Sequence, residues 1–343
     1  MGDLDNEWKM FLDNIYISSP PKKELVHDVA PKPTPIYIST KTVISFLNEC
    51  INLGDTFWKI PVISYTTPTI GVIKKQLKIN SCTVDEVTLI DDKIQQCEYG
   101  YSTIMQHVET LRGDIAKYKD VRKVTIGISK KDILSSRIKK RGAFYNCFVL
   151  IIRIKTINKF KEFHVKVFNT GKIEIPGIQD KTHIKYITDV LLDTLRIYYP
   201  NIVYNKSLEE TILINSNFNC GFYINRGSLY QILRKKYNIS AVYDSSSYPG
   251  IQCKIYYNDK VVTTIESIVV SFMIFRTGSV LIVGKCPDHV IHAIYDYLTI
   301  ILRDEYKNIV DMNSVHINKV VSTKTIKRSI LINNKQYKSK TYC

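Results

Sequence analysis

The sequence feature that most restricts the fold is a short motif that occurs twice. Val167–Gly177 reads VFNTGKIEIPG and Ile274–Gly284 reads IFRTGSVLIVG, so a Phe, a Thr and two glycines recur at a spacing of 107 residues. Each copy has the pattern of a β-hairpin, in which an apolar strand, a Thr-Gly turn and a second apolar strand follow one another. A supersecondary unit that recurs in this way indicates an internal duplication.

The elements around the two hairpins follow in the same order. An apolar strand precedes each hairpin, at Phe148–Ile154 in the first copy and at Ile251–Tyr257 in the second. A helix follows each hairpin, at about Thr182–Tyr199 and about Asp288–Tyr306, with apolar residues at helical spacing. Because the order agrees on both sides of the motif, a chance match of four residues is the weaker interpretation. We therefore predict two degenerate copies of one unit.

The start of the first copy has two candidate strands. The second copy begins with a strand at Thr211–Tyr223, followed by a short helix at Arg226–Lys236. In the first copy, Leu77–Thr83 shares Ile-Asn-Ser with that strand, while Val121–Ser129 also has the pattern of a strand. We favour the candidate near residue 77 over the one near residue 121, which makes Ser102–Tyr118 a helix within an inserted stretch.

The two ends of the chain differ in composition from the duplicated region. Five prolines between Pro20 and Pro35 indicate an extended segment, because proline fixes φ and removes a backbone donor. Thr42–Leu53 has apolar residues at helical spacing, and Gly54 is a plausible helix stop. The predicted organisation is a Pro-rich segment at 1–40, a helical or irregular extension at 41–76, a first repeat at 77–200, a second repeat at 201–310 and a basic tail at 311–343.

The overall charge favours a polyanionic partner. The chain has 48 Lys and Arg against 32 Asp and Glu, which gives a formal charge of +16. Frequent Ile, Lys, Asn and Tyr are typical of an AT-rich genome, so part of this charge has a codon-level origin. The eight cysteines form no C-x-x-C pair, which favours reduced thiols and an intracellular protein. The longest apolar stretch, Ile268–Val283, is interrupted and too short to span a bilayer.

These duplicated segments resemble the TATA-binding-protein family. In that family a strand, a helix, four further strands and a long helix occur twice. The family's hairpin signature, apolar-Ile-Phe-x-Ser-Gly-Lys, is similar to Val167–Lys172 and Ile274–Gly278, and its Phe-Pro-Gly-Leu-Ile strand is similar to Tyr248–Gln252. A Phe before a run that ends in Met-Arg-Ile is similar to Phe148 before Ile152–Ile154. The divergence is most like that of homologues in large nucleocytoplasmic DNA viruses.

The resemblance implies a fold and a function. The implied fold is of the α+β class, a saddle of two degenerate repeats whose curved antiparallel sheet carries helices on its convex face, with an N-terminal extension. The family binds promoter DNA through the minor groove with the concave face of the sheet, and apolar side chains open base steps and bend the duplex. The implied function is therefore a DNA-binding transcription initiation factor.

The resemblance also implies particular DNA contacts. Phe168 and Phe275 on the hairpin strands are the implied wedges, although side chains in apolar strands can equally face the core. Their implied partners are Tyr248 in the second copy and Phe148, or Cys147, in the first.

Asparagines near the pseudo-dyad of the family contact base edges. Asn215 is similar to one of them, and Asn80 is a weaker match to the other. The remaining implied DNA contacts are basic side chains of the same strands and turns, namely Lys172, Arg153 and Lys254.

The implied partners are AT-rich double-stranded promoter DNA, RNA polymerase and a TFIIB-like factor, with no membrane and no small-molecule substrate. We expect no enzymatic activity, metal or cofactor, because the chain has no phosphate-binding loop, no H-E-x-x-H and no dinucleotide fingerprint. The expected location is the host cytoplasm, in a viral factory, or the nucleus, or the virion. An alternative is a scaffold of the same fold with little specific DNA binding, because cysteine at 147 cannot act as a wedge and Asn217 is polar.

Overall fold

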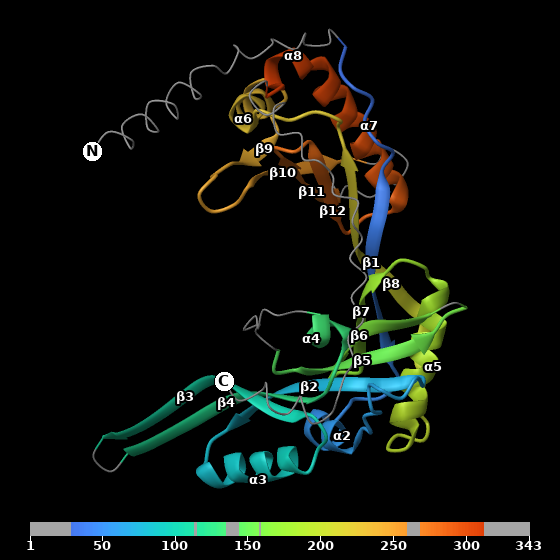
Figure 1. Cartoon of the computed structure of the whole chain (residues 1–343), viewed down its shortest axis with the longest axis vertical. Helices are drawn as coiled ribbons and strands as arrows, with labels where there is room; N and C mark the ends of the chain where they lie inside the picture. Colours follow the sequence, from blue (N-terminus) through green and yellow to red (C-terminus); the bar gives the residue numbers. More distant parts are fainter. Residues whose placement is uncertain (1–28, 113–114, 135–143, 158, 259–267, 312–343) are drawn as a thin grey trace, which may run out of the picture.

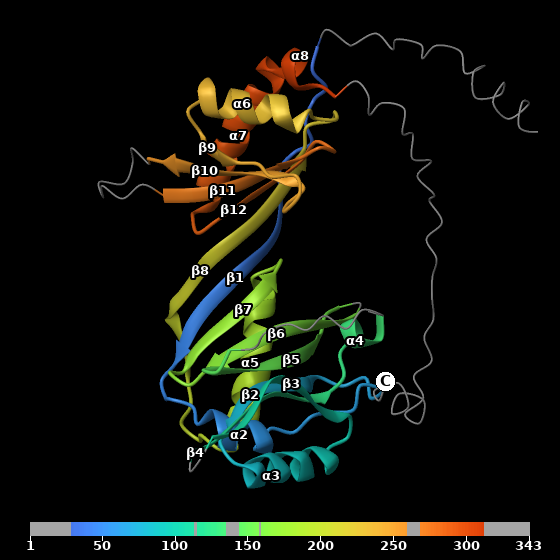
Figure 2. The ribbon, with the colours of Figure 1, turned by 90° about the vertical axis from the view of Figure 1, so that its left-hand side faces the viewer.

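A computed structural model describes residues 29–112, 115–134, 144–157, 159–258 and 268–311. The strands of these residues form one antiparallel sheet, in the order β3-β4-β2-β5-β6-β7-β1-β8-β12-β11-β10-β9. The sheet bends into an arch, with α5 and α7 on its outer side and an opening on the other (Figures 1 and 2). The predicted α+β class, with a curved antiparallel sheet and helices on its convex face, is confirmed. The segments before residue 29 and after residue 311 lie outside the described residues.

The second repeat forms the upper half of the arch in Figure 1. From the centre of the sheet outward its strands lie in the order β8-β12-β11-β10-β9. Its elements in chain order are β8 (Tyr204–Asn219), α6 (Arg226–Lys235), β9 (Ser240–Val242), β10 (Gly250–Tyr257), β11 (Ile268–Phe275), β12 (Ser279–Gly284) and α7 (Asp288–Asp304), followed by the short α8 (Tyr306–Ile309).

The first repeat has the same order outward from the centre, β1-β7-β6-β5-β2. Its elements in chain order are β1 (Tyr37–Leu47), α2 (Leu53–Lys59), β2 (Gly71–Ser81), β5 (Cys147–Lys155), β6 (Phe160–Phe168), β7 (Lys172–Ile178) and α5 (Thr182–Arg196). An insertion between β2 and β5 contributes α3 (Val84–Gln95), β3 (Gly100–Arg112), β4 (Ile115–Gly127) and α4 (Lys130–Leu134).

The first repeat begins at neither of the two predicted strands. Leu77–Thr83 falls largely in β2, which pairs with β5 in the way that β9 pairs with β10. Val121–Ser129 falls largely in β4, within the insertion. The strand that corresponds to β8 is β1, so the segment at 41–76 contains part of the first repeat and is not an extension outside it.

Two segments predicted as helices are strands. Thr42–Leu53 lies partly in β1, which pairs with β7 on one side and β8 on the other, and Ser102–Tyr118 lies in the β3–β4 hairpin. In β1, Val43 and Leu47 are buried in the core while Ile44 and Phe46 are half-buried on the opposite face. Apolar residues on both faces hide the period of two, so only the long-range pairing decides between helix and strand.

Each repeat has its own hydrophobic core beneath its long helix. The predicted amphipathic pattern is confirmed in α5, where Ile184, Ile187, Leu191 and Leu195 are buried against the first half of the sheet. Helix α7 buries its apolar side chains in the second core in the same way. No helix in the described part of the chain is long and apolar enough to cross a membrane.

The repeated Thr-Gly turns have a conformational cause. Gly171 and Gly278 have φ angles of 79° and 77°, in the left-handed region that side chains disfavour. A Cβ atom at Gly171 would lie 2.4 Å from the carbonyl oxygen of Glu49, and one at Gly278 would lie 2.3 Å from that of Phe222. Both turns therefore require glycine, which explains why it recurs in the two copies.

We expect Gly278→Ala to lower the free energy of unfolding by about 2 kcal/mol or more, because strain at positive φ adds to the backbone clash. Gly54→Ala is the matched control, since a Cβ there would meet no atom closer than 3.8 Å and the residue lies in α2. Urea denaturation measures both variants. Equal stability of the two variants would contradict the requirement for glycine at Gly278.

A lysine side chain is buried beneath β2. Lys75 is 3% exposed, and its Nζ donates to the carbonyl oxygens of Phe57 and Ile60, each at 2.6 Å, and of Trp58 at 3.3 Å. The ammonium therefore binds carbonyl groups at the end of α2, which a helix leaves without partners of its own. Burial lowers the pKa of Lys75 to about 8.

The buried Lys75 predicts a stability that depends on pH. Between about pH 8 and the ordinary lysine pKa the unfolded chain binds the proton that the folded chain has released, so this group adds stability as pH rises. We expect the wild type to gain stability over Lys75→Met between pH 7.5 and 9.5, at up to about 1.4 kcal/mol per pH unit. Denaturation at both pH values measures this difference, and a difference independent of pH would refute the prediction.

Candidate nucleic-acid interface

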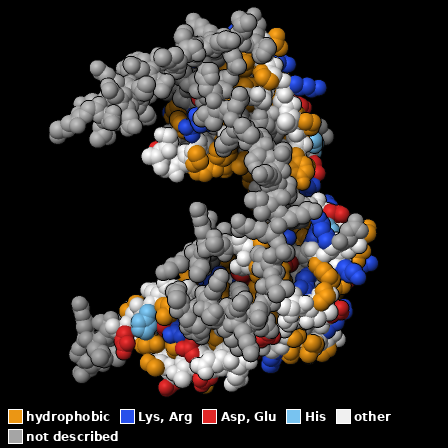
Figure 3. Space-filling model, viewed as in Figure 1, with side chains coloured by type: hydrophobic (Ala, Val, Ile, Leu, Met, Phe, Trp, Pro, Cys, Tyr) orange, Lys and Arg blue, Asp and Glu red, His pale blue; other side chains and the backbone are white. Residues whose placement is uncertain are grey.

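The concave face of the sheet carries the side chains that alternate with the core residues. In β11, Phe272 and Ile274 are fully buried against the helices, while Met273 and Phe275 lie on the opposite face and are partly exposed. Met273 lies opposite Leu281 of β12 in the register. Hydrophobic side chains consequently face the opening from the upper half of the arch (Figure 3).

An aromatic pair lies at the end of the concave face in the second repeat. The ring centroids of Tyr248 and Phe275 are 6.0 Å apart, and the rings are tilted by 58°. Gly250 lies opposite Phe275, and a Cβ there would come within 3.0 Å of the Phe275 ring and 3.2 Å of the Tyr248 ring. The hydroxyl of Tyr248 donates to the sulfur of Met273 at 3.5 Å. The two predicted residues of this half are therefore brought together, with glycine leaving room for both rings.

The corresponding pair in the first repeat contains a residue that the sequence analysis missed. Cys147 lies opposite Phe168 as Gly250 lies opposite Phe275. Tyr145 stands two residues before Cys147, as Tyr248 stands two residues before Gly250, and it is 50% exposed. The tyrosine at the same distance before the strand was the signal that could have identified it.

The predicted partners of Phe168 are wrong. Phe148 is 0% exposed, because it lies opposite Val167 and faces the helices with it. Cys147 is 2% exposed, and burial raises the pKa of its thiol. Neither side chain is available to a ligand, whereas Tyr145 and Phe168 are.

Lysines lie beside the exposed aromatic rings of the first repeat. The Nζ of Lys172 is 5.7 Å from the ring centroid of Phe168, and that of Lys78 is 3.5 Å from the ring centroid of Tyr145. The hydrogen bond from Lys78 holds the pKa of Tyr145 below its usual value. The predicted residue Lys172 thus lies next to the wedge candidate, and positive charge flanks both rings.

Arg153 has a structural role, so its prediction as a DNA contact is wrong. It is 5% exposed, and its guanidinium donates to the carbonyl oxygens of Tyr65 at 2.9 Å and Thr69 at 2.8 Å, and to that of Thr67. Burial lowers its pKa. The guanidinium anchors the loop between α2 and β2, which covers this end of the concave face.

Helix α4 covers the same end of the first repeat. Asp132 binds the Nζ of Lys74 at 2.7 Å and accepts hydrogen bonds from the backbone and hydroxyl of Ser129. Lys74, although on the concave side of β2, is only 5% exposed. The open part of this half is therefore the row around Tyr145 and Phe168, at the opposite ends of the same strands.

The two candidate asparagines are not brought together. Asn215 lies in the central strand β8, and its Nδ2 donates to Thr40 of β1 at 3.2 Å. Asn80 is exposed in β2, which is separated from β1 by β5, β6 and β7. The prediction that Asn80 corresponds to Asn215 is wrong, because the strand equivalent to β8 is β1.

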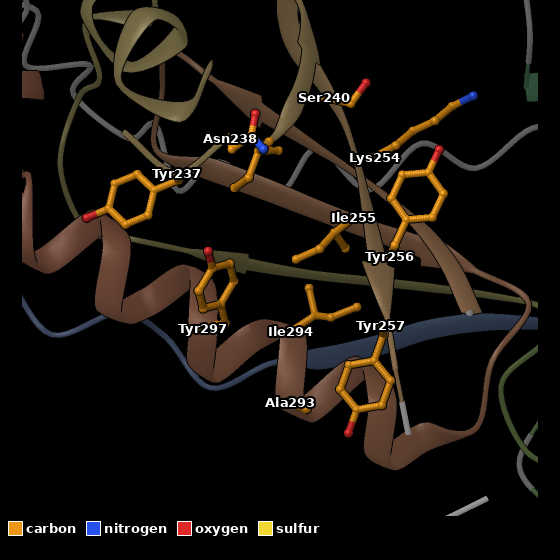
Figure 4. A pocket seen from close by; sticks show the side chains of 11 residues that line it. Tyr237, Asn238, Ser240, Lys254, Ile255, Tyr256, Tyr257, Ala293, Ile294 and Tyr297 are labelled. Carbon is orange, nitrogen blue, oxygen red and sulfur yellow. The ribbon is translucent and has the colours of Figure 1, made fainter. Parts of the chain in front are cut away.

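Lys254 is exposed on β10 and points away from the core. Figure 4 shows Lys254 and Tyr256 on one side of the strand, and Ile255 and Tyr257 on the side that faces α7. All four residues contribute to the lining of a groove of about 560 Å³, together with residues of α7. Lys254 therefore remains a candidate for the concave face.

One continuous antiparallel sheet, built from two copies of a unit and covered by helices on its convex side, defines a two-repeat saddle. Along the sequence, the chain is similar to a protein of Acanthamoeba polyphaga mimivirus named TATA-box-binding protein-like, with 23% identity over 209 residues. The match covers 53% of this chain and 54% of that protein, so the chain spans about half the length of its curated relative. The predicted resemblance to viral TATA-binding-protein-like proteins is thereby confirmed.

Among solved structures, the chain is similar to the TBP of Methanococcus jannaschii, with a TM-score of 0.38 and 12% identity. That match covers 79% of this chain and 99% of the other. No protein-family model matches the chain.

Substitution of Arg153 and of Lys254 tests whether the first has a structural role and the second lies on the surface. We expect Arg153→Met to lower the free energy of unfolding by about 2–4 kcal/mol, because three carbonyl groups lose a buried charged donor. Lys254→Met should change it by less than about 0.5 kcal/mol, since that side chain is exposed. Thermal and urea denaturation measure both. Equal effects would show that the guanidinium does not anchor the loop.

Proposed function

We propose that the protein binds AT-rich double-stranded DNA in the minor groove with its concave face, bends it, and acts in transcription initiation. The observation that carries the proposal is the recurrence of at least partly exposed aromatic side chains at equivalent positions of the two repeats, Tyr145 and Phe168 in the first and the contacting pair Tyr248 and Phe275 in the second. Apolar rings inserted between base pairs unstack them and kink the duplex toward the major groove.

The side chains around the aromatic pairs suit the same ligand. Lys172 and Lys78 lie against the rings of the first pair, where an ammonium can bind a phosphate on either side of the opened step. Met273 and Leu281 offer a flat apolar surface between the second pair and the centre of the sheet. Such a surface fits the sugar edges of a widened minor groove and adds burial that offsets the cost of unstacking.

The convex face is proposed to recruit the transcription machinery, with RNA polymerase and a TFIIB-like factor as partners. Support comes from the two long helices: Tyr186 of α5 is 55% exposed, and Tyr297 of α7 is 38% exposed. Exposed tyrosines on rigid helices are typical of binding surfaces. The name of the mimivirus relative agrees with a role at promoters.

A scaffold with little specific DNA binding is the second candidate function. It is favoured by the covered end of the first repeat, where Arg153 holds a loop and Asp132 holds α4 over the concave face. A duplex could then contact only part of that half. The two candidate functions differ in whether DNA binding depends on the aromatic pairs.

Fluorescence anisotropy on an AT-rich and a GC-rich duplex tests the proposal. We expect tighter binding to the AT-rich duplex. For the double variant Phe168→Ala with Phe275→Ala, we expect Kd to rise about tenfold or more, since a stacked ring contributes about 1–3 kcal/mol. Tyr186→Ala with Tyr297→Ala is the matched control, because it removes two aromatic rings from the convex face.

Either outcome separates the two functions. The wedge function requires the concave variant to lose the preference for the AT-rich duplex while the convex variant keeps it. Equal binding of both duplexes that is steep in salt and indifferent to the concave variant would leave the scaffold as the better account.

A further inference from the structure

The insertion extends the concave face of the first repeat beyond the point where the second repeat ends. The sheet of the second repeat ends at β9, a strand of 3 residues. In the first repeat, β2 is followed in the sheet by two further strands, β4 and then β3. Neighbouring strands are about 4.8 Å apart, so β4 lies about 5 Å farther from the centre of the arch than β2, the strand that corresponds to β9. Figure 1 shows the β3–β4 hairpin reaching outward at the lower end of the arch.

The side chains of β4 divide between the two faces of the sheet. Val124 and Ile126 are buried in the first core, and Arg122 binds Asp91 of α3 on the outer side at 2.8 Å. Lys119 and Lys123 alternate with these residues, so they point to the concave side.

The lysines of β4 lie next to Lys78, which is beside the exposed ring of Tyr145. Lys78 of β2 lies directly opposite Lys123 of β4, and the Nζ of Lys78 sits over the Tyr145 ring. Two lysines at directly opposed positions on one face raise the positive potential there. A row of positive charge therefore runs outward from Tyr145 and Phe168 across two further strands.

The acidic side chains of α3 lie on the outer side of the insertion, whereas Asp132 of α4 is paired with Lys74 on the concave side. Helix α3 packs on the outer face and carries Asp85, Glu86, Asp91 and Asp92. Acidic side chains appear along the lower edge of the molecule in Figure 3. This separation of charge makes the concave side of the insertion attractive to a polyanion and the outer side repulsive.

We infer that Lys78, Lys119 and Lys123 form a phosphate-binding track that lengthens the DNA contact on the side of the first repeat only. This inference rests on the proposed function. The added length of about 5 Å corresponds to about one to two base pairs at about 3.4 Å per base pair. The complex is consequently asymmetric about the bend, and the insertion gives the two ends of the bound DNA different contacts with the protein.

The test uses the full chain and the double variant Lys119→Ala with Lys123→Ala, which leaves both aromatic pairs intact. We expect the slope of log K against log salt on the AT-rich duplex to become shallower by about 1.8, or about 0.9 for each lost phosphate contact. Hydroxyl-radical footprinting should show protection shortened by about one to two base pairs at one end only. The preference for the AT-rich duplex should not change, because phosphate contacts carry no sequence information.

Lys181→Ala with Lys185→Ala is the matched control, since it removes two exposed lysines from the convex side at α5. The control should keep the wild-type slope and footprint. If both double variants have the same slope and footprint while the wild type still prefers the AT-rich duplex, the track is overturned and the proposed function stands. If the wild type shows no such preference, and the variant Phe168→Ala with Phe275→Ala binds DNA as tightly as the wild type, the proposed function fails and the inference fails with it.

Discussion

The antiparallel pairing of β1 with β8 is the interaction on which the rest of the structure depends. The ladder runs from Tyr37 opposite Asn217 to Leu47 opposite Tyr204, with three register shifts along its length. The free edge of β1 pairs with β7, and that of β8 pairs with β12, so this one ladder joins the two repeats into one sheet. Without it the two concave surfaces would have no common orientation.

Both cores depend on the same central strand. Ile38, near the start of β1, packs against the second core, while Val43 and Leu47 lie in the first. The Nζ of Lys41 binds Asp288 at the start of α7 at 2.7 Å, which ties β1 to the outer helix of the other repeat. A change in the curvature of the arch therefore has to disturb packing in both halves, which favours a rigid binding surface.

The two repeats share a plan and differ in what surrounds it. In the second repeat the concave face is open, and the sheet ends at a short strand. In the first, the loop held by Arg153 and the helix held by Asp132 cover one end of the face, while the insertion adds two strands beyond it. Duplication supplied a symmetric platform, and the insertion made it asymmetric. Under the proposed function, this asymmetry would hold DNA in one orientation without different bases being read at its two ends.

The features of this fold that have local causes can be predicted from the sequence alone. The two hairpins were predictable because their turns require glycine at Gly171 and Gly278, and the long helices were predictable because their apolar faces follow the helical period. That β1 is a strand follows from its pairing with β7 and β8, because apolar residues on both of its faces are compatible with either period. The burial of Phe148 follows from the register of β5 with β6, which places it opposite Val167, and leaves the exposed Tyr145 as the aromatic residue before this strand; register depends on segments far apart in sequence.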